Sequence, residues 1–312
     1  ALLHAPSAVM LQSPASSVTD ECLIEALREN SPGLFATEPH LRAALGDATA
    51  NPGRLLRARL VHHAVLTHGL GEAAALQLAC AIEYYHLASL LLDDLPCMDD
   101  SVTRRGRPCT HVVHGEASTI LSALALINRA YTLVGFALAH LPFGIRLRAQ
   151  ACLHAALGTA GIVRGQARDL RFRESDRSAR EVSAIAAGKT GALLSLAIYF
   201  PALLADPSPA ELHQLKALCL YWGLAYQASD DLHDLLATPS SGGKTTGRDR
   251  KLVRPNLALT IGVPLTRRRL HRLAILSVST LARLCSLHPR WDYLSEFQQS
   301  FITPILTREA AA

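Results

Sequence analysis

Several features are scarce in this 312-residue sequence, and each absence excludes a class of protein. The seven cysteines are an odd number without CxxC spacing, which argues against a disulfide framework and a zinc site and favours a reducing compartment. Charged residues make up only 18% of the chain, which is typical of apolar helices packed several deep. The net charge of +5 is too small to indicate nucleic acid, and an anionic substrate is enough to explain it.

Targeting and membrane-spanning segments are also not evident. The first twenty residues lack a basic start followed by an apolar core, so we expect no secretory signal. The longest membrane-like run, residues 191–205, contains Pro201 and is shorter than the roughly 20 residues that span a bilayer. These absences predict a cytoplasmic protein without a transmembrane segment.

Strand-like alternation of Val, Ile and Thr is scarce, and helical patterns dominate. We expect residues 1–18, rich in Ser, Pro and Ala, to be disordered, and residues 19–312 to form one all-α domain. A polar stretch from Thr238 to Arg254 is predicted to be a mobile flap. Helices are predicted at 19–30, 54–69, 72–92, 116–141, 146–172, 178–204, 208–237 and 265–288.

Two acidic clusters each end a strongly apolar stretch. The first aspartate cluster is Asp93-Asp94-Leu-Pro-Cys-Met-Asp99-Asp100, and the second is Asp230-Asp231-Leu-His-Asp234. Crowded carboxylates beside apolar surface are costly unless a cation neutralises them. Asp230 and Asp234 share a helix face, and Pro96 breaks its helix so that the loop can fold Asp99 back toward Asp93. The pair of clusters predicts a magnesium site for a diphosphate.

Basic segments accompany both clusters. Arginine forks match phosphate oxygens, and glycine allows the backbone to turn tightly between them. The segments are Arg104-Arg105-Gly106-Arg107-Pro108, Gly53-Arg54-Leu-Leu-Arg57, Gly188-Lys189-Thr190-Gly191 and Gly243-Lys244-Thr245-Thr246. The two lysine segments lack the first glycine of a Walker A loop, so nucleotide binding of that kind is not indicated.

Taken together, these segments resemble the trans-isoprenyl diphosphate synthases. The stretch from His86 to Asp100, followed by residues 104–108, is similar to the first aspartate-rich motif of bacterial geranylgeranyl diphosphate synthases of the carotenoid-pathway type. Gly165-Gln166-x-x-Asp169, Lys189-Thr190-Gly191 and Tyr226-Gln227-x-x-Asp230 occur in that family's order. The resemblance covers about residues 50–260. It implies a helical bundle of the isoprenoid synthase type, with a central cavity between two aspartate-rich helices, and a homodimer.

The resemblance also implies roles for individual residues. Up to three Mg²⁺ ions would be held by Asp93, Asp94, Asp99, Asp230 and Asp234. The diphosphate of an allylic substrate would contact Arg104, Lys189, Thr190 and Lys244. The diphosphate of isopentenyl diphosphate would contact Arg54, Arg57, His86 and Arg105. Gln227 would lie near the reacting carbons, and Asp93, Asp94, Asp230 and Lys189 would complete the catalytic set.

Departures from the family pattern and rival interpretations stay open at this point. The family's GGKxxR is Pro52-Gly53-Arg54-Leu-Leu-Arg57 here, and the 238–254 stretch differs in length and composition. A class I terpene cyclase shares the ionisation step but needs no second diphosphate site, and a non-catalytic partner subunit would not need both aspartate clusters. A di-iron bundle could use Glu83-x-x-His86, although a second Glu-x-x-His is not present in a suitable place.

Product length is expected to depend on the residues before Asp93. One helical turn rises about 5.4 Å, roughly the length of one isoprene unit, so a residue one turn earlier meets the growing tail. Ala88 and Ser89 are both small there, and Tyr84 or Tyr85 lies a further turn down as a candidate floor. These positions predict a C20 product, geranylgeranyl diphosphate, with a C15 or C25 product as the alternative.

The substitution Ala88→Phe tests this expectation. An aromatic side chain there should block the tail and shift the product from C20 toward C15, because the tunnel would close one turn below Asp93. The prenyl products of the variant and the wild type can be compared by chromatography. Unchanged C20 output would show that Ala88 does not line the tunnel.

Overall fold

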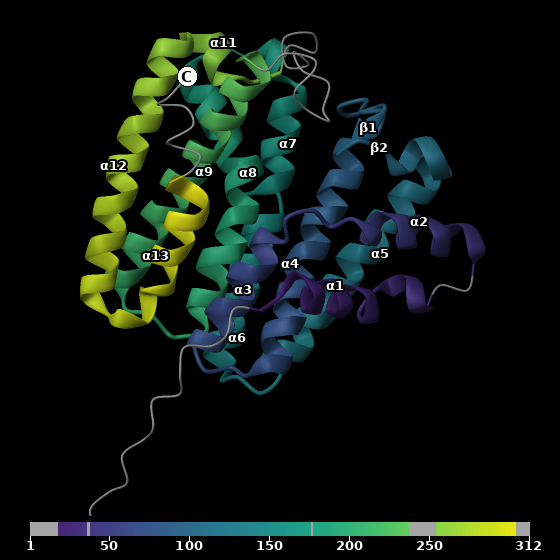
Figure 1. Cartoon of the computed structure of the whole chain (residues 1–312), viewed down its shortest axis with the longest axis horizontal. Helices are drawn as coiled ribbons and strands as arrows, with labels where there is room; N and C mark the ends of the chain where they lie inside the picture. The colour runs from purple at the N-terminus through teal and green to yellow at the C-terminus, as the bar shows by residue number, and fades with distance from the viewer. Residues whose placement is uncertain (1–17, 36–37, 176, 237–253, 304–312) are drawn as a thin grey trace, which may run out of the picture.

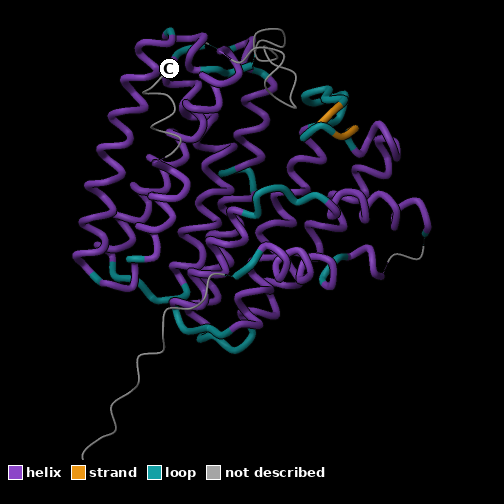
Figure 2. Tube along the Cα trace, in the orientation of Figure 1, coloured by secondary structure: helices purple, strands orange, loops and turns teal. Residues whose placement is uncertain are grey.

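Helices account for almost all regular structure in the described part of the chain (Figure 2). The computed structural model describes residues 18–35, 38–175, 177–236 and 254–303. Within these ranges the strands are the two-residue β1 (Thr103–Arg104) and β2 (Arg107–Pro108), which form one antiparallel hairpin. The all-α prediction is therefore confirmed, whereas the expectation about residues 1–18 concerns positions that, apart from Val18, lie outside the described residues.

The helices form a bundle in which α4, α8 and α9 run through the centre (Figure 1). In the first half of the chain the helices are α1 (Asp20–Glu29), α2 (Pro39–Ala50), α3 (Leu56–Thr67), α4 (Glu72–Asp93), α5 (Thr110–Leu138) and α6 (Phe143–Leu157). In the second half they are α7 (Ile162–Leu170), α8 (Ala179–Leu203), α9 (Pro209–Leu236), α11 (Leu257–Ile261), α12 (Val263–Leu287) and α13 (Tyr293–Phe297). Short helical turns are η1 (Pro32–Phe35), η2 (Phe172–Glu174), η3 (Pro289–Trp291) and the π-helical η4 (Gln298–Ile302).

Local sequence signals explain several helix ends. The Thr19 side chain accepts a hydrogen bond from the Cys22 backbone N–H and caps α1, as predicted. Ser178 caps α8 in the same way by accepting from the Glu181 N–H. Helix α4 ends at Asp93, three residues before Pro96, which cannot continue a regular helix.

The structure corrects the predicted helices in several places, and the short helices α11 and α13 were not predicted. The predicted helix 146–172 is two helices, α6 and α7, because the chain turns at residues 158–161. A Cβ on Gly161 would lie 2.0 Å from the Ala156 carbonyl oxygen, so this turn requires glycine. Helix α2 was not predicted, although Pro39 at its start and the capping side chain of Glu38 are ordinary start signals.

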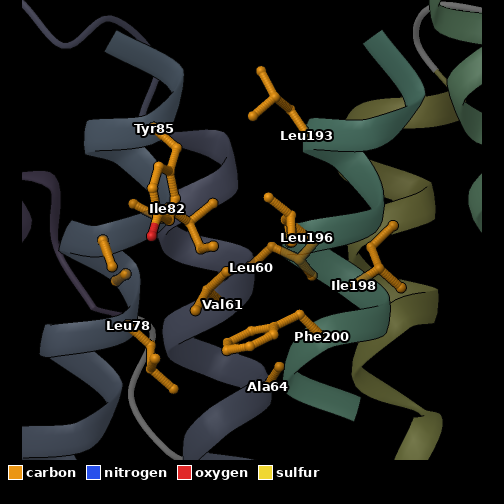
Figure 3. Packing of buried hydrophobic residues seen from close by; sticks show 14 of the residues in the cluster. Leu60, Val61, Ala64, Leu78, Ile82, Tyr85, Leu193, Leu196, Ile198 and Phe200 are labelled. Atoms are coloured by element: carbon orange, nitrogen blue, oxygen red, sulfur yellow. The ribbon is translucent and has the colours of Figure 1, made fainter. Parts of the chain in front are cut away.

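The main hydrophobic core lies between α3, α4 and α8 (Figure 3). Leu78 and Ile82 of α4 face Leu60 and Val61 of α3, and Phe200 of α8 closes the layer from the other side. All five side chains are at most 4% exposed. This packing holds the α4 and α8 backbones in place below the first aspartate cluster.

By length and composition alone, four helices could cross a membrane: α4, α5, α8 and α12. In α4 and α8, 67% and 61% of the most apolar window is buried inside the bundle, so core packing accounts for their apolar character. In α5 and α12 the buried share of that window is 33%. The expectation that the protein lacks a transmembrane segment therefore stays a prediction.

Glu211, near the start of α9, connects this helix to the turn η3 and to the end of α8. Its carboxylate accepts hydrogen bonds from the Arg290 guanidinium, the Trp291 indole N–H and the Ser208 backbone N–H. Burial alone would raise the pKa of Glu211, but these donors lower it to about 2. Arg290 also donates to the Ala205 carbonyl oxygen, so one buried ion pair connects α9, η3 and the end of α8.

We expect Glu211→Ala to destabilise the fold by about 3 kcal/mol, because it leaves the Arg290 charge without its buried partner. Urea unfolding at pH 7 measures this loss. Since the folded-state pKa of Glu211 is depressed, the difference from wild type should persist down to about pH 4.5 and shrink as the pH falls further toward 2. Glu174→Ala is the matched control, because its pair with Arg171 is exposed and should contribute at most about 0.5 kcal/mol.

Candidate active site

A cavity of about 310 Å³ opens at the end of the bundle where α4, α7, α8 and α9 meet. Its volume is in the range of small-molecule sites, about 300–1,000 Å³. Acidic side chains from three helices and one loop line it: Asp93, Asp99, Asp169, Asp230 and Asp234. Basic and hydrogen-bonding side chains alternate with them: Arg57, His86, Arg104, Lys189, Thr190, Gln227 and Arg254.

The loop after α4 folds Asp99 back toward Asp93, as the position of Pro96 predicts. The Asp99 backbone N–H donates to the Asp93 carbonyl oxygen over 2.9 Å, and the Met98 N–H donates to the Leu95 carbonyl oxygen over 2.9 Å. Both Asp93 and Asp99 line the cavity as a result. Their separation of six residues is therefore no obstacle to their acting together.

Asp94 has a different environment from its two neighbours in the cluster. Its side chain is 7% exposed and does not line the cavity. It accepts two hydrogen bonds from Arg104, from Nε over 2.7 Å and from Nη2 over 2.6 Å. The structure thus places Asp94 as the residue that orients the Arg104 guanidinium toward the cavity.

Glycines bring α7 against α8 and so position two charged side chains. A Cβ on Gly165 would lie 2.5 Å from the Lys189 backbone nitrogen and 2.6 Å from the Gly188 carbonyl carbon. The two backbones can approach this closely only without a side chain at Gly165. One turn later on α7, Asp169 accepts a hydrogen bond from Lys189 Nζ over 2.7 Å, and the same Nζ lies 3.7 Å from Asp93.

The charged side chains in this region shift one another's pKa values. Burial raises the pKa of Asp93 to about 6, Lys189 opposes that rise, and Asp99 adds to it. Burial alone would lower the pKa of Lys189, but Asp93 and Asp169 outweigh it and raise that pKa, so the amine stays protonated at neutral pH. A cavity that makes an isolated carboxylate costly is one that favours a bound cation.

A second glycine contact joins α8 to α9. A Cβ on Gly223 would lie 3.2 Å from the Gly191 Cα. Above this contact the Thr190 hydroxyl donates to Gln227 Oε1 over 2.7 Å, and Gln227 Nε2 donates to Asp231 over 2.8 Å. Asp231 also accepts from the Leu257 backbone N–H at the start of α11, and it is 1% exposed. Within the second aspartate cluster, Asp231 therefore supports the fold, whereas Asp230 and Asp234 line the cavity.

A second group of basic side chains lies at and next to the cavity wall. Arg57 Nη1 is 3.5 Å from His86 Nε2, and Arg105 Nη1 donates to the Asn51 carbonyl oxygen over 3.1 Å. Burial and the neighbouring arginines lower the pKa of His86, which keeps the imidazole neutral. Gly53 has a φ of +89°, a backbone conformation that favours glycine, and the Arg105 guanidinium packs closely over it.

Comparison with known proteins identifies the family. A family model described as polyprenyl synthetase matches residues 38–271. The chain belongs to the polyprenyl synthetase family. The resemblance drawn from the aspartate clusters is thereby confirmed.

Among curated relatives, a geranylgeranyl diphosphate synthase of Pseudescherichia vulneris is 36% identical over 209 residues, covering 66% of each chain. A farnesyl diphosphate synthase of Bacillus subtilis is 33% identical, covering 63% of this chain and 67% of that one. The chain spans 66% and 60% of the length of the first two curated relatives, so slightly under two thirds.

Solved structures confirm the isoprenoid synthase type of fold. A farnesyl/geranylfarnesyl diphosphate synthase from Zymomonas mobilis superposes with a TM-score of 0.75 at 28% identity, covering 90% of this chain and 95% of that one. A geranyltransferase from Helicobacter pylori, solved with magnesium and isoprenyl diphosphate, has a TM-score of 0.75 at 23% identity, covering 92% of this chain and 100% of that one. The second likeness concerns the fold alone.

In this member of the polyprenyl synthetase family, the structure brings most of the predicted site residues together around one cavity. Those lining the cavity are Arg57, His86, Ser89, Asp93, Asp99, Arg104, Lys189, Thr190, Gln227, Asp230 and Asp234. Arg54 and Arg105 have largely exposed side chains at its edge, and Lys244 lies outside the described residues. Sequence reasoning assigned no role to Asp169 or Arg254; the Gly-Gln-x-x-Asp spacing was the available signal for Asp169.

The tail-length residues do not all face the cavity. Ser89 lines it, but Ala88 is 1% exposed and packs in the core. The Tyr84 hydroxyl donates to the Leu27 carbonyl oxygen on α1, so Tyr84 points away from the cavity and is the weaker candidate for a floor. The Tyr85 ring lies 5.4 Å from that of Tyr131 on α5, and its buried hydroxyl has no partner among the described residues.

The cavity residues fit a magnesium ion, although no three His, Cys, Asp or Glu side chains form a tight ligand group in the described part of the chain. Magnesium commonly takes one or two carboxylates and fills its other positions with water and phosphate oxygens. Asp93 and Asp99 from one side, and Asp230 and Asp234 from the other, are such carboxylates. The same finding gives no support to the di-iron alternative.

The different environments within the second cluster can be separated by mutation. We expect Asp231→Ala to lower the melting temperature by several degrees, because it removes two buried hydrogen bonds worth about 3 kcal/mol together. Asp230→Ala should leave the melting temperature within about 1 °C, since this residue is exposed at the cavity mouth. Thermal unfolding in EDTA measures both. Equal losses in the two variants would contradict the support role of Asp231.

Proposed function

We propose that the protein is a trans-prenyltransferase that joins isopentenyl diphosphate to an allylic diphosphate. The observation that carries the proposal is one cavity lined by carboxylates from both aspartate clusters. These are Asp93, Asp99, Asp230 and Asp234, and the cations Arg104 and Lys189 line the same cavity. Carboxylates and cations in alternation fit a metal-bound diphosphate, because the anion needs positive partners on every side.

In this proposal each group of residues binds one component of the reaction, either the metal or a diphosphate. Magnesium held by Asp93, Asp99, Asp230 and Asp234 would withdraw charge from the allylic diphosphate and favour its departure. Arg104, oriented by Asp94, and Lys189, kept protonated by its acidic neighbours, would stabilise the charge on the leaving diphosphate. The allylic C–O bond then breaks, and the double bond of isopentenyl diphosphate attacks the resulting carbocation.

The second substrate would be held by the two arginines Arg57 and Arg105 together with the neutral imidazole of His86. Arg57 and His86 line the cavity away from the aspartate clusters, and Arg105 is a charged neighbour of His86, so these side chains can hold a second diphosphate. A terpene cyclase has no need for this second group, which favours the transferase. The attack leaves a carbocation on the isopentenyl unit, and loss of a proton from a carbon beside it forms the new double bond. We propose that the departing diphosphate accepts this proton, since burial and the neighbouring arginines lower the pKa of His86.

For the product we propose geranylgeranyl diphosphate. The small residue Ser89 lines the cavity and supports a long tail, whereas Ala88 packs in the core beside it. Curated relatives include both geranylgeranyl and farnesyl diphosphate synthases at similar identity, 36% and 33%, so the support comes from these positions. Tyr85, rather than Tyr84, is the proposed floor because Tyr84 is bonded to α1.

We also propose a cytoplasmic homodimer. The outer sides of α5 and α6 expose several large apolar side chains, and apolar surface of this kind commonly marks an interface. They include Leu121, Leu124, Tyr131, Phe136, Phe143 and Leu147, each between 47% and 71% exposed. A second copy of the chain would cover them.

A direct assay tests the transferase. Purified protein with Mg²⁺, radiolabelled isopentenyl diphosphate and a C5, C10 or C15 allylic diphosphate should yield labelled prenyl diphosphate, with C20 as the largest product. Asp93→Asn should lower kcat/KM about a thousandfold, because a charge that holds the metal is lost. Asp206→Asn, in an exposed pair with Arg148, is the matched control and should have wild-type activity. No incorporation with any primer would leave a cyclase or a non-catalytic subunit.

A further inference from the structure

Arg254, just before α11, reaches into the cavity and binds residues from two other elements. Its Nη2 lies 3.0 Å from Asp99 Oδ1 and donates to the Met98 carbonyl oxygen over 2.6 Å. Its Nη1 lies 3.6 Å from Asp169 Oδ1. The side chain is 12% exposed, so this guanidinium is enclosed by the site rather than resting on its surface.

The cations and carboxylates of this wall form one continuous series of ion pairs. Arg254 joins Asp99 to Asp169, and Lys189 joins Asp169 to Asp93. Two of the carboxylates that would hold magnesium, Asp93 and Asp99, therefore have a cationic side chain beside them already. The protein itself supplies the positive charge that the metal would otherwise bring.

The series is not fully satisfied. Asp169 Oδ1 and Arg254 Nε are buried and have no hydrogen-bond partner among the described residues. The Asp169–Arg254 separation of 3.6 Å is an ion-pair distance but too long for a good hydrogen bond. Buried polar atoms without partners raise the free energy of an arrangement, so the Arg254 contacts can be exchanged for better ones at little cost.

We propose that Arg254 is a positioning residue that acts as the resident counter-ion of Asp99 and Asp169 and competes with magnesium for Asp99. Metal alone then binds weakly, because it must displace the guanidinium. A diphosphate that arrives with the metal offers the released guanidinium a new acceptor, so the two bind cooperatively. This inference rests on the proposed function, since it takes Asp99 as a magnesium ligand.

Isothermal titration of the full-length protein with Mg²⁺ alone, and with Mg²⁺ in the presence of inorganic pyrophosphate, tests the competition. Arg254→Met should bind Mg²⁺ alone about tenfold more tightly than wild type, because one charge-assisted contact no longer has to be broken. Pyrophosphate should tighten Mg²⁺ binding in wild type and do so less in the variant. Arg254→Lys, which keeps the charge, should stay close to wild type.

The direction of the change in Mg²⁺ affinity separates this role from a structural one. If Arg254 only stabilised the site, its loss would weaken Mg²⁺ binding; equal or weaker binding in Arg254→Met overturns the proposal and leaves the transferase standing. Arg168→Met removes an arginine from α7 that pairs with Glu181 instead, so it controls for the general loss of charge and should not tighten binding. Arg254→Gln provides a second test if the methionine variant unfolds. Wild type that fails to bind Mg²⁺ even with pyrophosphate would contradict the proposed function itself.

Discussion

The cost of enclosing several carboxylates in a cavity with apolar walls controls the arrangement of this site. Asp93, Asp99 and Asp169 each stand near a cation, either Lys189 or Arg254, and burial still raises the pKa of Asp93 to about 6. The side chains that surround the cavity are therefore not independent ligands. Each one limits where its neighbours can lie and which protonation state they adopt.

That charge arrangement depends in turn on close backbone contacts between helices. Gly165 and Gly188 allow α7 and α8 to touch, and Gly191 and Gly223 do the same for α8 and α9. These contacts place Asp169 against Lys189 and Thr190 against Gln227. A larger residue at Gly165 would separate the helices and pull the ion pair apart without changing any charged residue, so the glycines are as much a part of the site as its charges.

Much of the fold and of the site was predictable because its signals are local. Long apolar helices, the cap at Thr19 and the break at Pro96 each follow from a few adjacent residues. The helix pair α6 and α7 was predicted as one because the turn near Gly161 depends on a contact with Ala156 that sequence periodicity does not show. Asp94 was grouped with Asp93 and Asp99 as a metal ligand for a related reason: composition makes adjacent aspartates look equivalent.

The sequence by itself determined which residue types the site contains: two aspartate clusters with arginines and lysines beside them, a pattern that predicts a metal-bound diphosphate because few other ligands balance those charges. Only the tertiary structure decided which aspartates face the cavity and which face the protein. Asp94 turns to Arg104 and Asp231 to the start of α11, while Arg254 enters from a distant part of the chain. Residue type specifies which interactions are possible, but helix packing and loop closure determine which partners come within reach.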